Sequence, residues 1–193
     1  NSSQELELWK EVIEYNPTKF DEKFLQGEYN DVILSNSVES VEQYFKAPRT
    51  GRSIRIGRKD KQEIWSLVED FVKVKGQNHT KLELCQKLIS FFEKREEKPF
   101  SHLICDEVQD FSNLELSLMR KLISEKPNDL FFVGDPFQNI YGRKVNFSKS
   151  GINVRGRRSR KLKVNYRTTE EIKKKAINVI SAESYDNFDG EEE

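Results

Sequence analysis

An acidic pair, Asp106 and Glu107, directly follows the short apolar run HLIC at residues 102–105. Carboxylates are protein ligands that suit Mg²⁺, and a neighbouring carboxylate can take the proton of an attacking water. This order fits a magnesium–nucleotide site, in which Asp106 holds the metal, often through its water, and Glu107 activates the nucleophile. An acid at a strand end can instead cap the helix that follows, which would explain Asp106 or Asp110 singly.

A second apolar run, LFFV at residues 130–133, ends in the same way at Gly134 and Asp135. Asp135 is placed to brace the site formed by the first acidic pair. Gln138, about one turn later, is placed for a γ-phosphate or a water. Because helix capping does not explain both acidic ends together, we interpret them as one site.

The elements around these residues predict how they are brought together. Both apolar runs have the length and flanking residues of buried strands in a parallel sheet. Apolar residues recur at helical spacing between them, with Ser112 at the N-cap, Glu115 three residues later and Pro127-Asn128 at the end. Strand–helix–strand units are right-handed in nearly all cases. Both acidic ends should therefore emerge on one rim, where open α/β sheets bind ligands.

The first hundred residues predict a unit made only of helices, at residues 3–15, 18–26, 37–45, 60–75 and after the cap Thr80. The short segment 28–34 predicts either a strand or the turn before the next helix. The arginine-rich loop at 49–59 is expected to be solvated, with contact to DNA as the alternative.

The residues after the second acidic end are basic and irregular over 142–160. Residues 161–165 predict a third strand, and Thr168 is expected to cap a helix that runs to about residue 180. Residues 143–175 carry 13 basic and 2 acidic groups, although the formal charge of the whole chain is zero. This segregation indicates an acidic partner for the basic segment, or a solvated surface that the acidic ends neutralise.

Composition excludes some classes of protein. No run of eighteen or more apolar residues is present in the 193 residues, so a membrane-spanning helix is not expected. Two cysteines, Cys85 and Cys105, do not make a disulfide framework, and a reducing, cytoplasmic compartment is expected.

Three segments resemble motifs of the superfamily 1 DNA helicases of the UvrD/Rep type, in the right order and at about the right spacing. DEVQD (106–110) resembles motif II, the DExxD form of Walker B, GDPFQNIY (134–141) resembles motif III, and LKVNYRTTEEI (162–172) resembles motif IV. The resemblance covers roughly residues 28–190. It implies an α/β fold, a partial RecA-like P-loop NTPase sheet of parallel strands with crossover helices, preceded by an all-helical insert domain.

The resemblance also implies ATP and Mg²⁺ as cofactors and gives roles to the matching residues. Asp106 would coordinate Mg²⁺ and Glu107 would activate the hydrolytic water. Gln109 and Gln138 would sense the γ-phosphate and couple it to the DNA-contacting segment, with Asp135 beside them.

Motif IV would add two nucleotide contacts. Tyr166 would stack on the adenine, and Arg167 would reach the γ-phosphate as an arginine finger. Single-stranded or partly duplex DNA is the implied partner. The residues expected to face DNA are Tyr141, Arg143, Arg155, Arg157 and Arg158, because arginines suit phosphate contact and aromatic rings stack on bases. Base stacking would fall to Tyr141 or to Phe147.

One motif of the family is missing: the phosphate-binding pattern G-x-x-x-x-G-K-[ST] appears nowhere in the 193 residues. We therefore expect a middle part of a longer helicase, whose Walker A segment and C-terminal motor domain lie elsewhere in the parent. The expected divisions are the helical insert at 1–98, the second part of the first RecA-like domain at 99–160, and the start of the second RecA-like domain with a tail at 161–193.

The isolated chain is not expected to hydrolyse ATP, although its parent would. The alternative is a non-enzymatic module, derived from a helicase, that binds nucleic acid or a partner. A two-metal nuclease using Asp106, Glu107 and Asp135 is a more distant third, since it needs further carboxylates that the sequence does not place.

Overall fold

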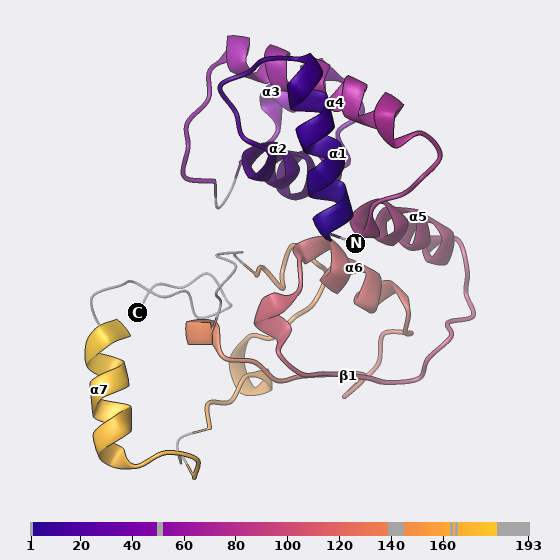
Figure 1. Ribbon diagram of the computed structural model, residues 1–193. Coiled ribbons are helices and arrows are strands. Elements are labelled where there is room, and N and C mark those ends of the chain that lie inside the picture. The colour runs from indigo at the N-terminus through magenta and orange to yellow at the C-terminus, as the bar shows by residue number, and fades with distance from the viewer. Residues whose placement is uncertain (1, 50–51, 139–144, 163, 165, 181–193) are drawn as a thin grey trace. The chain divides into compact units, whose positions relative to one another are not determined.

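The computed structural model describes residues 2–49, 52–138, 145–162, 164 and 166–180, and the chain divides into two compact units (Figure 1). Unit 1 comprises residues 1–97 and unit 2 comprises residues 98–193. The two strands of the described residues both lie in unit 2, so the chain combines a helical part with a small α/β part, as its sequence predicts.

Unit 1 is helical throughout its described residues. Its elements are α1 (Ser2–Tyr15), α2 (Glu22–Glu28), the π-helix η1 (Tyr29–Leu34), α3 (Val41–Lys46), α4 (Arg58–Lys75) and α5 (Lys81–Glu93). The helices predicted over 60–75 and after Thr80 are confirmed as α4 and α5. Thr80 caps α5, because its hydroxyl accepts a hydrogen bond from the N–H of Glu83.

The core of unit 1 forms where α1 packs against both α2 and α4. Ile64 and Phe71, on one stripe of α4, are fully buried, as are Trp9 of α1 and Leu25 of α2. The rings of Trp9 and Phe71 stack with their centroids 4.0 Å apart. Apolar residues at helical spacing therefore face one another, and this burial is what makes these short helices stable.

Residues 29–34 are neither a strand nor a turn but the π-helix η1, which continues directly from α2. Tyr29, Val32, Ile33 and Leu34 are all buried there. A short apolar run is compatible with a strand or a buried helix, and only its packing decides between them. Here the packing against neighbouring helices, α5 among them, favours the helix.

The arginine-rich loop was expected to be solvated, and for two of its arginines this is wrong. Arg49 donates to both carboxylate oxygens of Glu28, with Nε–Oε1 2.7 Å and Nη2–Oε2 2.8 Å, and Arg52 Nε lies 3.2 Å from Oε2. Glu28 is completely buried and also accepts a hydrogen bond from the hydroxyl of Tyr44. A buried carboxylate needs cationic partners, and the loop supplies them.

Unit 2 contains a two-stranded parallel sheet formed by β1 (Leu103–Cys105) and β2 (Leu130–Phe132). The strands pair in register Leu103 with Leu130, Ile104 with Phe131 and Cys105 with Phe132. The other described elements of unit 2 are η2 (Val108–Asp110), α6 (Asn113–Lys121), η3 (Pro136–Gln138), η4 (Gly156–Arg158) and α7 (Glu170–Ile180). The predicted strand–helix–strand order is confirmed, with α6 between the strands.

Helix α6 begins where the sequence predicts. Ser112 Oγ accepts a hydrogen bond from the N–H of Glu115, and the Glu115 carboxylate accepts one from the N–H of Ser112. The helix ends at Lys121, earlier than the predicted end at Pro127-Asn128. Its Leu116 is fully buried in the core of unit 2, which contains Val108, Leu116, Val145, Phe147 and Ile152.

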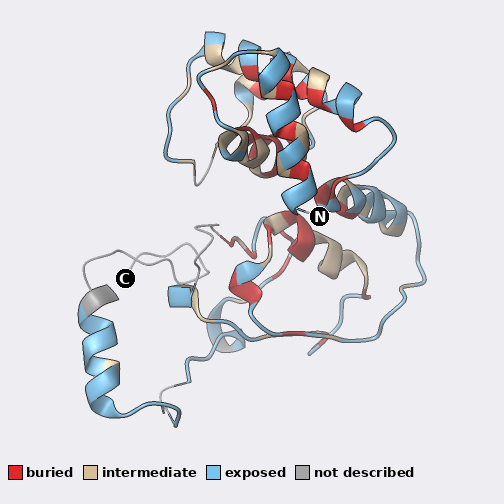
Figure 2. Cartoon of the chain, viewed as in Figure 1, coloured by how far each residue is buried: buried red, intermediate tan, exposed pale blue. Residues whose placement is uncertain are grey.

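The predicted third strand at 161–165 is not observed: Lys161, Leu162 and Val164, its described residues, are exposed and not in a strand. Helix α7 begins at Glu170, and Thr169 rather than Thr168 stands at its N-cap, since Thr169 Oγ1 accepts from the N–H of Ile172. Figure 2 shows α7 as almost wholly exposed. Of the helices in the described parts of the chain, none is long and apolar enough to cross a membrane.

Candidate nucleotide site

The two acidic ends lie at the same edge of the sheet because the strands are parallel and in register. Asp106 and Glu107 directly follow β1, and Gly134 and Asp135 follow β2 after Val133. Backbone hydrogen bonds extend the pairing past the strands, from Val133 N to Cys105 O at 2.8 Å and from Val108 N to Val133 O at 3.0 Å. We call Asp106, Glu107 and Asp135 the acidic rim.

Asp106 and Glu107 both have exposed side chains. Asp106 Oδ1 accepts a hydrogen bond of 2.8 Å from the N–H of Glu107. Glu107 has φ 52° and ψ 44°, the left-handed conformation that residues other than glycine seldom adopt. This conformation turns the chain sharply between β1 and η2.

Gln109 is almost completely buried, and its amide connects the two strand ends. Nε2 donates to Glu107 Oε2 at 2.6 Å, and Oε1 accepts from the N–H of Asp135 at 3.1 Å. The expected role of Gln109 as a γ-phosphate sensor stays a prediction, and in this structure its amide is buried and bonded at both ends.

Asp135 organises the short helix η3 that follows β2. Its Oδ1 accepts from the N–H of Phe137, and its Oδ2 accepts from Gln138 Nε2, each at 3.0 Å. The side chain of Gln138 is exposed. The hydrogen bonds therefore run without a break from Asp106 through Glu107, Gln109 and Asp135 to Gln138, so the structure brings these five predicted residues together.

The rim fits a Mg²⁺ ion that also binds a nucleotide. Such an ion commonly takes one or two carboxylates and completes its coordination with phosphates and water, and the exposed Asp106 carboxylate can serve in that way. Among the described residues, no three or more His, Cys, Asp or Glu side chains are grouped so that they could hold a metal without other ligands. This gives no support to the two-metal nuclease.

The thiol of Cys105, beside the rim, is not a candidate nucleophile. Burial raises its pKa above the ordinary value, and its Sγ lies 3.6 Å from Met119 Sδ of α6. The protonated thiol packs as a small apolar group.

The remaining predicted site residues are described only in part. Tyr166 is 93 % exposed, and Arg167 is also exposed. Arg155 and Arg158, which flank or lie in η4, are exposed as well. Tyr141, Arg143 and the side chain of Arg157 lie outside the described residues. The roles of all these residues stay predictions. Phe147, the alternative to Tyr141 for base stacking, is buried in the core of unit 2, so its ring is not available to a base in this structure.

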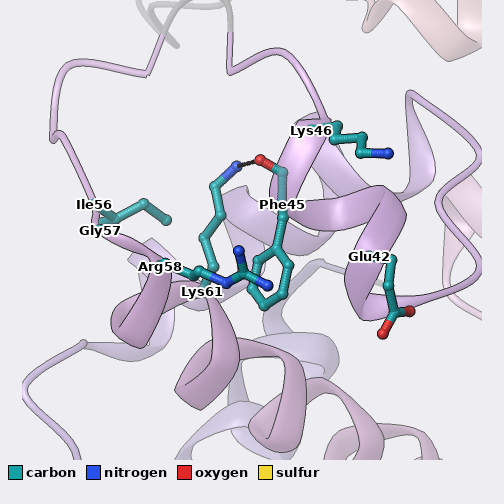
Figure 3. Close-up of a pocket in the computed structure, with 7 residues that line it drawn as sticks. All are labelled: Glu42, Phe45, Lys46, Ile56, Gly57, Arg58 and Lys61. Atoms are coloured by element: carbon teal, nitrogen blue, oxygen red, sulfur yellow. Dashed lines mark hydrogen bonds between the residues drawn. The ribbon is translucent and has the colours of Figure 1, made fainter.

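The sequence did not point to a shallow depression of about 520 Å³ in unit 1, between the end of α3 and the start of α4. Arg58 lies over the ring of Phe45, 4.5 Å from its centroid, and Lys61 Nζ donates to the carbonyl oxygen of Phe45 at 2.9 Å (Figure 3). Glu42, Lys46, Ile56 and Gly57 complete the lining. The lining therefore carries three cationic side chains and one carboxylate.

A signal for this depression is present in hindsight. Phe45 is directly followed by a basic stretch, residues 46–59, which includes the arginine-rich loop. Its basic residues include Lys46, Arg55, Arg58 and Lys59. Basic residues interleaved with aromatic residues are a general feature of surfaces that bind single-stranded nucleic acid.

Comparison with known proteins places this site in context. Residues 2–147 match the sequence model described as the UvrD/REP helicase N-terminal domain. The human TPR and ankyrin repeat-containing protein 1 is 28% identical over 145 residues, which cover 69% of this chain and 5% of that protein. The ATP-dependent DNA helicase srs2 of Schizosaccharomyces pombe is 33% identical over 84 residues, which cover 42% of this chain and 9% of that protein.

No solved structure is a significant match to this chain. The chain spans less than a tenth of each of these two relatives. The family match covers most of the 193 residues and includes both acidic ends. The chain therefore belongs to the UvrD/REP helicase N-terminal domain family.

Proposed function

We propose that this chain is part of an ATP-dependent DNA helicase or translocase, in which Mg²⁺–ATP hydrolysis at the acidic rim drives movement along single-stranded DNA. The observation that carries the proposal is the continuous hydrogen-bond path from Asp106 to Gln138, which joins the ends of two parallel strands. The family match and the srs2 similarity support it. The sheet would be the second part of a RecA-like domain.

The chemistry follows from the positions of the carboxylates. Bound Mg²⁺ would neutralise charge that develops on the phosphates. Asp106 would hold the metal through its exposed carboxylate. Glu107 would accept the proton of the water whose oxygen attacks the γ-phosphorus, while the bond to the leaving ADP oxygen breaks. Gln138, exposed at the end of η3, would orient the γ-phosphate or the water.

A phosphate-cradling loop is needed beside this rim, and the 193 residues contain no G-x-x-x-x-G-K-[ST] pattern. We propose that a segment of the parent protein outside these residues supplies it, and that a second motor domain of the parent closes on the nucleotide. The purified 193-residue chain should therefore show no ATP turnover at helicase-like rates. Such turnover by the pure chain would contradict this part of the proposal.

The decisive test is Glu107→Gln in the full-length parent. Removing a general base should lower kcat for ATP by roughly 10²–10⁴-fold, while the affinity for nucleotide is kept because Asp106 is unchanged. Phosphate release and fluorescent-nucleotide binding measure the two quantities. The control is Glu7→Gln, which removes an exposed ion pair between Glu7 and Lys10 in α1. Equal turnover in both variants would overturn the assignment of the base.

The depression beside Phe45 favours a second candidate function, a non-enzymatic module that binds nucleic acid. Binding of the 193-residue chain to fluorescent single-stranded DNA across a salt series would test it. Log affinity falls as log salt concentration rises, and each phosphate contact makes that fall steeper by about 0.7. Arg58→Gln should reduce that slope, and Arg95→Gln, in the segment after α5, serves as the control. No measurable binding at the lowest salt concentration would exclude DNA binding by this chain.

A further inference from the structure

Gln109 differs from the rest of the rim because it is buried. Only 1 % of its surface is exposed, whereas Asp106 and Glu107 on the same turn are exposed. Both ends of its amide are used, one by the carboxylate of Glu107 and the other by the backbone of Asp135. A buried amide with both ends satisfied fixes its neighbours rather than binding an external ligand.

We propose that Gln109 is a positioning residue that fixes the carboxylate of Glu107 to the end of β2. This inference rests on the proposed hydrolysis at the rim, but the positioning itself is a property of the fold. The N–H of Asp135 holds Oε1, so the amide plane of Gln109 is set by the β2 side. Nε2 then directs Glu107 Oε2 from a fixed point, 2.6 Å away.

Gly134 supplies a second observation for this role. A Cβ at position 134 would lie 2.7 Å from Gln109 Oε1 and 2.6 Å from Val108 Cγ1, both too close for an unstrained contact. Its nearest backbone atom, the N of Val108, would be 3.2 Å away. The chain after β2 thus approaches Gln109 so closely that only glycine leaves room for the amide.

The backbone of Glu107 supplies a third observation for the positioning role of Gln109. Its left-handed conformation, with φ 52°, is unfavourable for a residue with a Cβ. Such a conformation persists where the surroundings hold it. The surroundings here are the hydrogen bonds to Asp106 and Gln109. A shift of residues 134–138 would therefore be transmitted through Gln109 to the carboxylate that takes the proton.

The first experiment measures the positioning without nucleotide, by amide hydrogen exchange in the 193-residue chain. Gln109→Met keeps the approximate length of the side chain and loses both hydrogen bonds. Exchange at the Asp135 amide should become about tenfold faster, which is the effect of losing one hydrogen bond. The Val133 amide, bonded to Cys105 O, should be unchanged. Equal acceleration at both amides would mean general destabilisation and would overturn the inference.

Two further variants guard against misfolding. Gln109→Glu places a second carboxylate against that of Glu107, and repulsion between the like charges should draw the side chain away from the Asp135 N–H, so the Asp135 amide should exchange faster than in the wild type. Gly134→Ala leaves Gln109 in place in the sequence but displaces its amide, so it should reproduce the exchange of Gln109→Met. Wild-type exchange at the Asp135 amide in either variant would contradict the geometry.

The second experiment measures catalysis by the full-length parent. Gln109→Met and Gln109→Glu should each lower kcat at least about tenfold and leave the KM for ATP within about twofold. Gln86→Met is the matched control, because Gln86 of α5 also makes two hydrogen bonds, to Leu34 O and Ser37 Oγ, both within unit 1. A raised KM with unchanged kcat would make Gln109 a nucleotide contact and overturn the inference.

The failure of this inference and the failure of the proposed function give different results. If the wild-type parent itself does not hydrolyse ATP, the proposed function is wrong and the catalytic role of Gln109 falls with it, whatever the exchange data show. If the wild type hydrolyses ATP and Gln109→Met matches it, only the positioning role is wrong.

Discussion

Glu28 is a carboxylate with no exposed surface, and its stability depends on the three groups that surround it. Arg49 and Arg52 pair with its oxygens, and Tyr44 donates its hydroxyl. The loop that carries both arginines is thereby held on the end of α2. At the scale of single residues, this network, the Lys75–Glu83 pair and the Arg120–Asp129 pair are the buried charges that we expect to matter for folding.

Glu28→Gln should destabilise unit 1 by roughly 3–5 kcal/mol, because it leaves two arginines facing a neutral group in a buried position. Urea unfolding followed by tryptophan fluorescence measures this, since both tryptophans of the chain, Trp9 and Trp65, lie in unit 1. Glu7→Gln removes an exposed pair with Lys10 and should leave the stability close to that of the wild type. Similar costs for the two variants would show that the buried network is not important.

Asp129 should make unit 2 sensitive to acid. Burial alone would raise the pKa of this carboxyl, but the hydrogen bond from Arg120, at 2.8 Å, and that from the N–H of Lys126 hold it below the ordinary value. A lowered folded-state pKa stabilises the protein above the unfolded value of about 3.9, and that contribution is lost as the pH falls through the folded value.

Arg120→Met should therefore raise the pKa of Asp129 toward its unfolded value, lower the stability of unit 2 near neutral pH, and make the further loss of stability on acidification smaller than in the wild type. Carboxyl-carbon NMR titration gives the pKa directly, and resolved signals of unit 2 followed between pH 2 and pH 6 give the stability. An unchanged titration of Asp129 in this variant would show that Arg120 does not stabilise the charge.

At the scale of elements, the N-cap of α6 joins the helix to the turn that follows the acidic rim. Ser112 and Glu115 are both buried and exchange hydrogen bonds in both directions. Ser112→Ala should cost about 1–2 kcal/mol in the stability of unit 2. Ser117→Ala is the control in the same helix. It removes a hydroxyl that donates to the carbonyl of Asn113 one turn earlier, and it should cost close to nothing. Thermal unfolding of the two variants compares them.

The elements that the sequence predicts well are those whose local signals agree with their packing. The stripe of α4, the capping box of α6 and the two apolar runs ending in acids all appear where expected. Residues 28–34 and 161–165 were predicted less well, because a short apolar or alternating segment becomes a strand only beside a partner strand. Tertiary contacts decide such segments, and local pattern does not.

In the acidic rim, too, some features can be predicted from the sequence and others cannot. Parallel strands bring Asp106, Glu107 and Asp135 together, and this follows from their places after the apolar runs. The burial of Gln109 does not follow from the sequence, because it depends on how closely the chain at Gly134 approaches.

At the scale of the whole molecule, unit 2 exposes an apolar face of its sheet. Ile104 is 77 % exposed and its register partner Phe131 is 60 % exposed. A short parallel sheet with an open apolar face favours association with other chains. We expect the purified chain to self-associate with increasing concentration, in sedimentation or light scattering.

Replacing both residues by threonine keeps β-propensity and removes the apolar surface, so Ile104→Thr with Phe131→Thr should reduce the association. Leu84→Thr with Leu88→Thr, on the exposed side of α5, is a control for a general loss of apolar surface. A wild-type chain that stays monomeric at every concentration would contradict the expectation.

The left-handed backbone of Glu107 has a consequence for stabilising the protein by mutation. Glycine and asparagine adopt that conformation more readily than glutamate does, so glutamate is not the most stabilising residue for position 107. Thermostability and turnover should then compete at this single site. A library at position 107 selected only for heat resistance should return glycine or asparagine, whereas selection for hydrolysis in the parent should return glutamate.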